Sequence, residues 1–364
     1  MSNTESINTN SLSQDVLLDW QSAAHLGSKN VGGKAWNLGR LQQFGFNVPA
    51  GGVLATSHYL QFIEENSLAE PIRSASESIT LQNINSAESE LCITTIQTKI
   101  QQGVFPATMV TDLVFALENK QLLNKPLAIR SSASAEDSIK ASFAGIHDSF
   151  LNINGIDPII AAIKSCYASV WSKRAVSYRR KMQIHDQDVL PAVVIMQLID
   201  ADAAGVAFSC DPVSGREDIC LVNANFGLGE SVVNGSIEPD SYRINRYSFI
   251  TEDKQRGKKQ HATRVNKLAG TSDIATEQVG NPALQWVLSN TQQEELGLLI
   301  NRVFSALSPS EVHQDIEWAI KDNIFYLLQA RPVTVLPRYT TDVLGEQPDI
   351  WSNSNFRDAL PMVV

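Results

Sequence analysis

Cysteine is scarce in this chain. Its 364 residues include four cysteines, and no two of them form a C-x-x-C pair. Their scattered positions also lack the spacing of a zinc site; they are Cys92, Cys166, Cys210 and Cys220. Such cysteines are usually buried, reduced thiols of cytoplasmic proteins. We therefore predict no disulfide bridge and a cytoplasmic location.

A surplus of positive charge is also missing. The chain has 29 Lys and Arg against 39 Asp and Glu, which gives a net charge of −10. Surfaces of this kind do not bind nucleic acid or anionic membranes through bulk electrostatics. We expect neither as a partner, and a polyanionic ligand would have to be held by a local cluster of cationic side chains.

Long hydrophobic runs are absent from the sequence. No run reaches the roughly 18 apolar residues of a membrane helix, and residues 1–14 form a polar start without the apolar core of a signal peptide. The composition, 43% hydrophobic and 19% charged, is that of a globular protein with ordinary cores. We expect no membrane span and a flexible segment at residues 1–14.

Several familiar motifs are absent as well. The GGK segment at residues 32–34 is not a P-loop, because Ala35 stands where that motif has Ser or Thr. The FGLGE segment at residues 226–230 lacks the third glycine of the dinucleotide fingerprint, and no G-x-S-x-G elbow occurs. The histidines show neither metal spacing nor a Gly/Thr-rich turn typical of phosphorylated histidine; they are His25, His58, His147, His185, His261 and His313.

The most informative segment that is present reads as a β-hairpin. Two apolar-rich runs, DIEW at residues 315–318 and LLQARP at residues 327–332, flank the polar turn 321–323. Strand residues two apart share a face, so the polar side chains of each run should point the same way. An odd-numbered or bulged turn would then bring the two polar faces side by side.

The polar faces of this hairpin carry a set of groups suited to a Mg-nucleotide. Asp315 and Glu317 share one face, and Gln329 and Arg331 share the other. Oxygen atoms of Glu317 and Gln329 suit a hard cation, and the planar fork of Arg331 suits phosphate oxygens. A half-exposed hairpin with a solvated polar face is the alternative that this segment alone leaves open.

Two further segments could hold phosphate groups. Lys34 follows two glycines at the start of a predicted helix, where the helix dipole and the ammonium group both favour an anion. Arg130 ends a predicted apolar strand and precedes residues 131–145, which are rich in Ser, Ala and Gly. Small side chains allow the backbone to approach a phosphate chain closely. An exposed lysine and a Ser/Ala-rich linker are the respective alternatives.

In their order along the chain, these segments resemble the N-terminal nucleotide-binding domain of pyruvate phosphate dikinase, phosphoenolpyruvate synthase and rifamycin phosphotransferase. The resemblance covers about residues 32–332 and rests on the motifs GGKAWNLG, RSSASAEDS, ASFAG, GVAFSCDPVSG, NANFGLGESVVNG, DIEW and LLQARPVT. It implies an α+β fold of the ATP-grasp type, in which two lobes clamp MgATP. We expect lobes at residues 15–190, with a helical insert, and 191–337, and a linker or the start of a following domain at residues 338–364.

The resemblance also implies roles for individual positions. Lys34 and Arg130 would contact the phosphates, with Gly145 against the triphosphate and Ser149 near the nucleotide. Gln197 would lie at the linker beside the adenine. Glu317 and Gln329 would hold Mg²⁺, and Arg331 would stabilise the phosphate in transfer. Lys34, Arg130 and Arg331 are thus the expected catalytic residues.

The family passes the phosphoryl group to a histidine on a separate swivelling domain. No histidine here matches that phosphohistidine motif, so we expect the chain to be the ATP-binding portion of a longer phosphotransferase that also carries histidine and acceptor domains. The small-molecule acceptor stays open between a rifamycin-like antibiotic, pyruvate and a precursor of prodigiosin-type pigments joined by a condensing ligase. A carboxylate–amine ligase and a non-catalytic ATP-sensing module are the alternatives.

Overall fold

The computed structural model describes residues 15–134, 149–267, 269–275, 284–308, 312–333 and 336. The predicted site residue Gly145, the flexible start at residues 1–14 and the predicted linker at residues 338–364 lie outside the described residues. Helices span Trp20–Leu26 (α1), Ser28–Gln43 (α2), Thr56–Glu65 (α3), Ala69–Ser78 (α4), Ala87–Gln102 (α5), Ala107–Asn119 (α6), Ile156–Ser169 (α7), Lys173–Met182 (α8), Glu230–Val233 (α9) and Asn290–Leu307 (α10). Strands span Gly51–Leu54 (β1), Leu127–Ala133 (β2), Ser149–Ile153 (β3), Pro191–Gln197 (β4), Ala203–Phe208 (β5), Ile219–Phe226 (β6), Asp240–Asn245 (β7), Thr251–Gln255 (β8), His261–Val265 (β9), Thr271–Ala275 (β10), Gln314–Lys321 (β11) and Ile324–Pro332 (β12).

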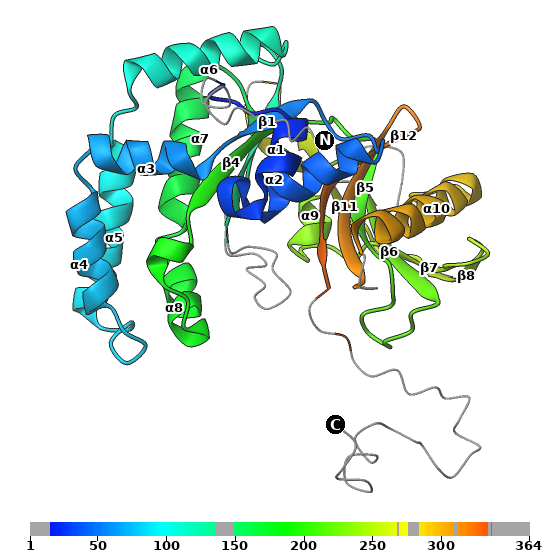
Figure 1. Ribbon diagram of the computed structural model, residues 1–364. Coiled ribbons are helices and arrows are strands. Elements are labelled where there is room, and N and C mark those ends of the chain that lie inside the picture. Colours follow the sequence, from blue (N-terminus) through cyan, green and yellow to red (C-terminus); the bar gives the residue numbers. More distant parts are fainter. Residues whose placement is uncertain are drawn as a thin grey trace, which may run out of the picture.

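The strands of the described residues form two main antiparallel sheets. One has the order β1-β4-β2-β3, the other has the order β12-β11-β5-β6-β7-β8, and β9 and β10 form a separate hairpin. Helices are segregated from the strands over much of the chain, so the expected α+β class is confirmed. In Figure 1 the layer of helices α3 to α8 lies on the left, the six-stranded sheet with α10 lies on the right, and α1 and α2 lie between them.

The four-stranded sheet is buried on both faces. Ile129 and Ile195 project into a core shared with α3, α5, α6 and α7, whereas Ala128 and Val194 pack against α1 and α2. Strand β4 is correspondingly apolar and buried up to Met196, as expected of a strand covered on both sides, and ends with Gln197. The face toward α1 and α2 also touches the six-stranded sheet, through Ala319.

The six-stranded sheet is covered on one face by α10. Ile316 and Trp318 of β11 pack against Leu296 and Ile300 of that helix. Its two outer strands are β12 and β8. Helix α2 packs along β12, whereas β8 is an exposed strand that carries the charged residues 252–254.

Strand β4 belongs to the four-stranded sheet. It pairs with β1 and β2, and its residues 191–197 are the first residues of the second lobe that the sequence analysis expects. The chain passes to the other sheet between Gln197 and Ala203. The apolar run of β4 predicts a strand but does not indicate its partners, which lie far away in the sequence.

The predicted hairpin at residues 315–331 is confirmed. Asp322 and Asn323 connect its strands with positive φ values of 50° and 61°, which is the conformation of a two-residue type I′ turn. The strand register shifts between Glu317 and Trp318. The irregularity thus lies within the strands rather than in the turn, and Glu317 pairs with Gln329.

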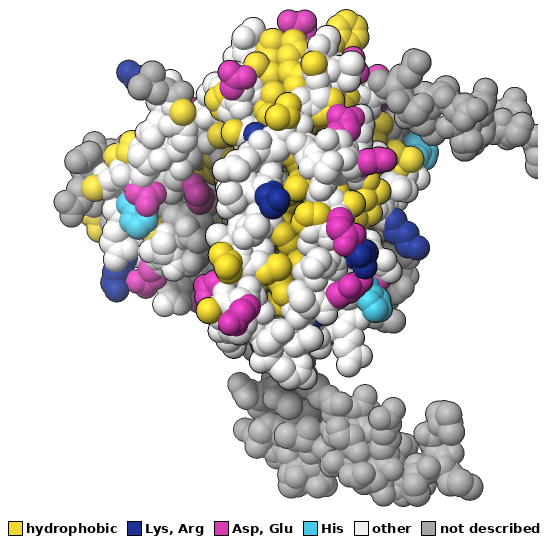
Figure 2. Space-filling view, turned by 90° about the vertical axis from the view of Figure 1, so that its left-hand side faces the viewer, with side chains coloured by type: hydrophobic (Ala, Val, Ile, Leu, Met, Phe, Trp, Pro, Cys, Tyr) yellow, Lys and Arg dark blue, Asp and Glu magenta, His cyan; other side chains and the backbone are white. Residues whose placement is uncertain are grey.

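Within the part of the chain that the structure describes, no single helix is long and apolar enough to cross a membrane. Helices α5 and α6 meet the length and composition criteria only as a pair, across a bend of 68°. Figure 2 shows apolar side chains between polar ones on the face that lies at the left of Figure 1. Leu60, Leu91 and Phe115 are exposed apolar residues of the helical layer.

The buried His313 side chain should make the folded protein less stable in mild acid. Burial lowers its pKa, with a smaller effect of Arg246 in the same direction and an opposing effect of Glu217. The Nδ1 atom of its ring forms a hydrogen bond of 3.0 Å with the Ser209 hydroxyl, and the tautomer decides which of the two donates. Because the folded-state pKa lies below the unfolded value of about 6.5, this stability is present above that value and is lost as pH falls through the folded pKa.

We therefore expect the free energy of unfolding to fall between about pH 7 and pH 5, and His313→Gln to flatten part of that fall. Urea unfolding at several pH values measures the free energy of unfolding of both proteins. Burial also lowers the pKa of His58, so some slope should remain in the variant. An unchanged slope in His313→Gln would contradict the assignment.

Candidate nucleotide-binding site

A cavity of about 290 Å³ lies between the two sheets. The four-stranded sheet contributes Arg130, Ser149 and Gln197, and the six-stranded sheet contributes Glu317. Four of the residues predicted from the sequence thus line one space, although they come from four different strands. This cavity is the candidate functional site.

The guanidinium group of Arg130 is the centre of this site. Its Nη2 atom donates to Glu317 Oε2 at 2.6 Å and to Gln329 Oε1 at 3.1 Å. Its Nη1 atom donates to the Leu328 carbonyl at 3.2 Å, and Nε donates to the Ser149 hydroxyl at 3.4 Å. One side chain of β2 therefore joins its neighbour β3 to both strands of the hairpin. The Arg130 and Glu317 side chains are only 12% and 16% exposed.

The oxygen atoms of Glu317 and Gln329 fit the predicted magnesium site by chemistry and by placement. Both lie within 3.1 Å of a single cationic atom, Arg130 Nη2, so both reach one small position between the strands. A carboxylate and an amide oxygen are ligands that Mg²⁺ accepts. Among the described residues, no group of three or more His, Cys, Asp or Glu side chains could hold a metal ion.

Arg331 lies on the same face of the hairpin but has a different close partner. Its Nε and Nη2 atoms donate to Asp315 Oδ2 at 2.8 and 2.6 Å. Asp315 is opposite Arg331 in the register, as Glu317 is opposite Gln329. Burial raises the pKa of Asp315 and Arg331 opposes that shift. The sequence predicted the shared face, but it did not predict this ion pair, and Arg331 is not among the residues that line the cavity.

Lys34 lies on α2, a helix that forms hydrogen bonds with strands of both sheets. The helix is broken at Gly32, where φ is 75° and ψ is 165°. Asn37, one turn beyond Lys34, donates through Nδ2 to the Ala330 carbonyl of β12 at 2.9 Å. Lys34 itself is 9% exposed and does not line the cavity. The structure therefore places it on a helix that packs against β2 and β12, beside the strands that carry Arg130 and Gln329.

The remaining wall of the cavity is largely apolar. Gln197 ends β4, and Leu198 and Ile199 continue the wall. Sequence reasoning gave no role to residues 228–230, which complete it from the other sheet. The glycine-rich turn FGLGE marks that segment and is part of a motif of the family resemblance, but no role was inferred for its individual residues. The full lining also includes Ala128, Leu151, Met196, Ala201, Ala204, Gly205, Val233, Asn234, Trp318, Ala319 and Leu328.

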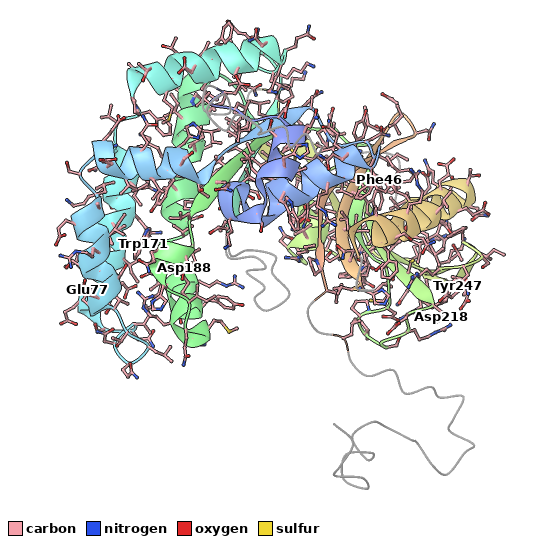
Figure 3. The ribbon with its side chains drawn as sticks, viewed as in Figure 1. Phe46, Glu77, Trp171, Asp188, Asp218 and Tyr247 are labelled. Atoms are coloured by element: carbon pink, nitrogen blue, oxygen red, sulfur yellow. The ribbon has the colours of Figure 1, made fainter. Side chains whose placement is uncertain are left out.

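A second cavity, of about 590 Å³, lies within the helical layer. Trp171 and Glu77, labelled in Figure 3, contribute to its wall. The buried Arg179 side chain in this wall donates to Asp186 and to the Val170 carbonyl, each at 2.5 Å. These charged groups satisfy one another, and none of the residues predicted from the sequence lines the cavity, so we assign it no function.

Comparison with known proteins agrees with the motifs. The profile described as "Pyruvate phosphate dikinase, AMP/ATP-binding domain" matches residues 28–347, which is most of the chain. The chain belongs to the pyruvate phosphate dikinase AMP/ATP-binding domain family. The expected resemblance is thereby confirmed.

Curated relatives carry names from two branches of this family. A probable phosphoenolpyruvate synthase of Methanocaldococcus jannaschii is 32% identical over 89% of this chain and 27% of its own length. A rifampicin phosphotransferase of Streptomyces sviceus is 32% identical over 90% of this chain and 37% of its own length. A probable phosphoenolpyruvate synthase of Methanothermobacter thermautotrophicus is 33% identical over 86% of this chain and 45% of its own length. The chain thus spans less than half the length of these relatives.

A solved structure with partial similarity is D-alanine–D-alanine ligase from Bacillus anthracis complexed with ATP. It shares 11% sequence identity, covers 86% of this chain and gives a TM-score of 0.31. A TM-score of this size does not establish a common fold.

The Arg130 junction makes a prediction about stability. Arg130→Met should lower the free energy of unfolding by about 1–3 kcal/mol, because it leaves the half-buried Glu317 carboxylate without its cation. Adding Glu317→Gln should restore part of the loss, since a neutral amide needs no cation. Urea unfolding measures both variants.

Arg73 provides a matched control for this experiment. It pairs with Glu70 and Glu77 on α4, but these side chains are 61–72% exposed. Arg73→Met should have little or no effect, because exposed ion pairs contribute little. If Arg130→Met is as neutral as Arg73→Met, the junction does not hold the two sheets together.

Proposed function

We propose that this domain binds MgATP in the cavity between the two sheets and is the phosphoryl-donating part of a longer phosphotransferase. The observation that carries the proposal is the contact of Arg130 with both Glu317 and Gln329 beside that cavity, whose wall includes Arg130 and Glu317. A cation for phosphate and two oxygen ligands for a metal meet there. The family match to an AMP/ATP-binding domain supports the same ligand.

The cavity suggests which part of the nucleotide lies where. Leu151, Met196 and Leu198 offer an apolar surface to the adenine, and Gln197 adds an amide at its edge. The phosphates would extend toward Arg130 and Ser149. This arrangement matches the roles that the family resemblance implies for Gln197, Ser149 and Arg130, and it leaves Lys34 to contact the phosphates from α2.

Binding would require Arg130 to exchange partners. In the structure its guanidinium group occupies the position between Glu317 and Gln329. When bound, a divalent cation would neutralise phosphate charge at those two oxygens. Arg130 would then turn its donors toward phosphate oxygens, for which a planar fork is well suited. The ion pair thus keeps both site residues in place before the ligand arrives.

Phosphoryl transfer requires little covalent chemistry from the protein. Its transition state spreads charge over phosphate oxygens, which fixed cations stabilise. Arg130 and Lys34 would supply such charge, and Arg331 would do so from its place two residue pairs along the hairpin from Glu317 and Gln329. Its bidentate bond to Asp315 fixes the orientation of that guanidinium group.

The later steps would take place on other domains. We propose transfer to a histidine of a downstream swivelling domain, with AMP and phosphate as products of the full cycle, and a small organic acceptor. The two lobes of an ATP-grasp arrangement would divide after β4, between Gln197 and Ala203, rather than at residue 190. Identifying AMP rather than ADP as product separates this cycle from that of a carboxylate–amine ligase.

Glu317→Gln tests the metal ligand. We expect ATP affinity in the presence of Mg²⁺ to fall by about tenfold or more, and affinity with EDTA to stay equal or rise, because Arg130 loses its charged partner. Calorimetric titration with and without Mg²⁺ gives both values. Glu230→Gln is the matched control, since it removes another carboxylate from the cavity and should leave the ratio of the two affinities unchanged. An equal loss in both titrations of Glu317→Gln would indicate a structural role.

Arg331→Ala tests the catalytic assignment. In a protein that includes the histidine domain, we expect transfer of label from ATP to histidine to slow by about 100-fold or more. Asp315→Asn should accompany it, so that no buried carboxylate is left unpaired, with Asp315→Asn alone as control. Turnover equal to that of the control would remove Arg331 from the mechanism. Tight ATP binding with no label on histidine in the unsubstituted protein would favour a sensing module instead.

A further inference from the structure

The break in helix α2 has an identifiable cause. In an unbroken helix the N–H of Ala35 would bond to the carbonyl of Val31, four residues earlier. In this structure the Ala35 N–H donates to the Ser132 hydroxyl at 3.2 Å, and that hydroxyl donates to the Val31 carbonyl at 3.0 Å. A side chain from 97 residues along the chain is thus inserted into the hydrogen-bond ladder of the helix, which is a known cause of kinks.

Gly32 is the residue that makes this insertion possible. Its φ of 75° lies in the region that favours glycine. A Cβ atom at this position would lie 2.0 Å from the Ser132 carbonyl oxygen and 2.3 Å from the hydroxyl oxygen. The backbone of α2 therefore approaches β2 as closely as a glycine allows. Ser132 is completely buried at the contact.

Ser132 links the two proposed phosphate-binding cations. It lies two residues beyond Arg130 on β2, and residues two apart share a face of a strand. Ala35, which it holds, follows Lys34 directly. The hydroxyl therefore fixes the start of the second part of α2, with Lys34 on it, relative to the strand that carries Arg130.

We infer that Ser132 is a positioning residue of the nucleotide site. Its hydroxyl maintains the break of α2 at Gly32 and thereby orients Lys34 toward the phosphates. The inference rests on the proposed function. Ser132 does not touch the nucleotide in this scheme. It acts through Lys34, so its removal should weaken the binding of phosphates and spare the binding of the adenine and ribose.

The test compares the binding of ATP with the binding of adenosine, both to the chain of 364 residues. Ser132→Ala should weaken ATP binding in the presence of Mg²⁺ by about tenfold, the size of effect of one lost hydrogen bond near a charged group. Adenosine affinity should change by less than about twofold. A merely structural role would move both ligands together. Ser132→Thr, which keeps a hydroxyl group, should recover most of the ATP affinity.

Ser131 supplies a matched control. It is adjacent on the same strand and 1% exposed, and its hydroxyl has no hydrogen-bond partner among the described residues. It faces the helical layer together with Ile129, away from α2. Ser131→Ala should leave both affinities unchanged. If Ser132→Ala does not fold, Ser132→Cys fills the same space with a weakly hydrogen-bonding thiol and should show the same selective loss for ATP.

A double-substitution cycle tests the route through Lys34. With Lys34→Met already present, Ser132→Ala should cost less than about twofold in ATP affinity, because the group it positions is gone. A full tenfold cost in that background overturns the inference, as does an unchanged ATP affinity in Ser132→Ala alone. Failure of the unsubstituted chain to bind ATP overturns the proposed function itself, so the two failures are distinguishable.

Discussion

The charge-assisted contact of Arg130 with Glu317 and Gln329 is the interaction on which the arrangement of the site depends. It joins β2 of one sheet to both strands of the hairpin at the edge of the other. Breaking such a pair exposes one charge to a low-dielectric wall, which is costly, although forming it also costs desolvation. We therefore expect the contact to contribute mainly by fixing the position of one sheet relative to the other, since the two sheets share no strand.

A second set of contacts around Asp202 supports that alignment. Its carboxylate accepts from Lys321 Nζ at 2.8 Å and from the Asp322 N–H at 2.9 Å, at the turn of the same hairpin. Its backbone carbonyl accepts from the Gly227 N–H at 2.9 Å. Asp202 follows the wall segment that begins at Gln197. Asp202, in the connection between β4 and β5, thus contacts both the hairpin and the glycine-rich turn beside the cavity.

Local patterns predicted the parts of this site better than their connections. The hairpin followed from two apolar-rich runs on either side of the polar turn 321–323, and Glu317 and Gln329 lie opposite each other on it. The partners of β4, the ion pair of Arg331 with Asp315 and the insertion of Ser132 into α2 were not predictable in this way. Each joins residues whose separation in sequence or whose exact side-chain geometry no local pattern encodes. The cavity wall at residues 228–230 was missed because its glycine-rich turn contributed to the family resemblance without indicating a role for any single residue.

The charged edge strand β8 has a consequence for neighbours. An outer strand offers unpaired backbone groups to any other strand, and charged side chains along it oppose such pairing. Glu252, Asp253 and Lys254 are exposed on β8, while α2 covers the opposite edge at β12. Both margins of the six-stranded sheet are thereby guarded against strand addition. Any polypeptide that approaches either edge of this sheet therefore has little opportunity to extend it by one strand.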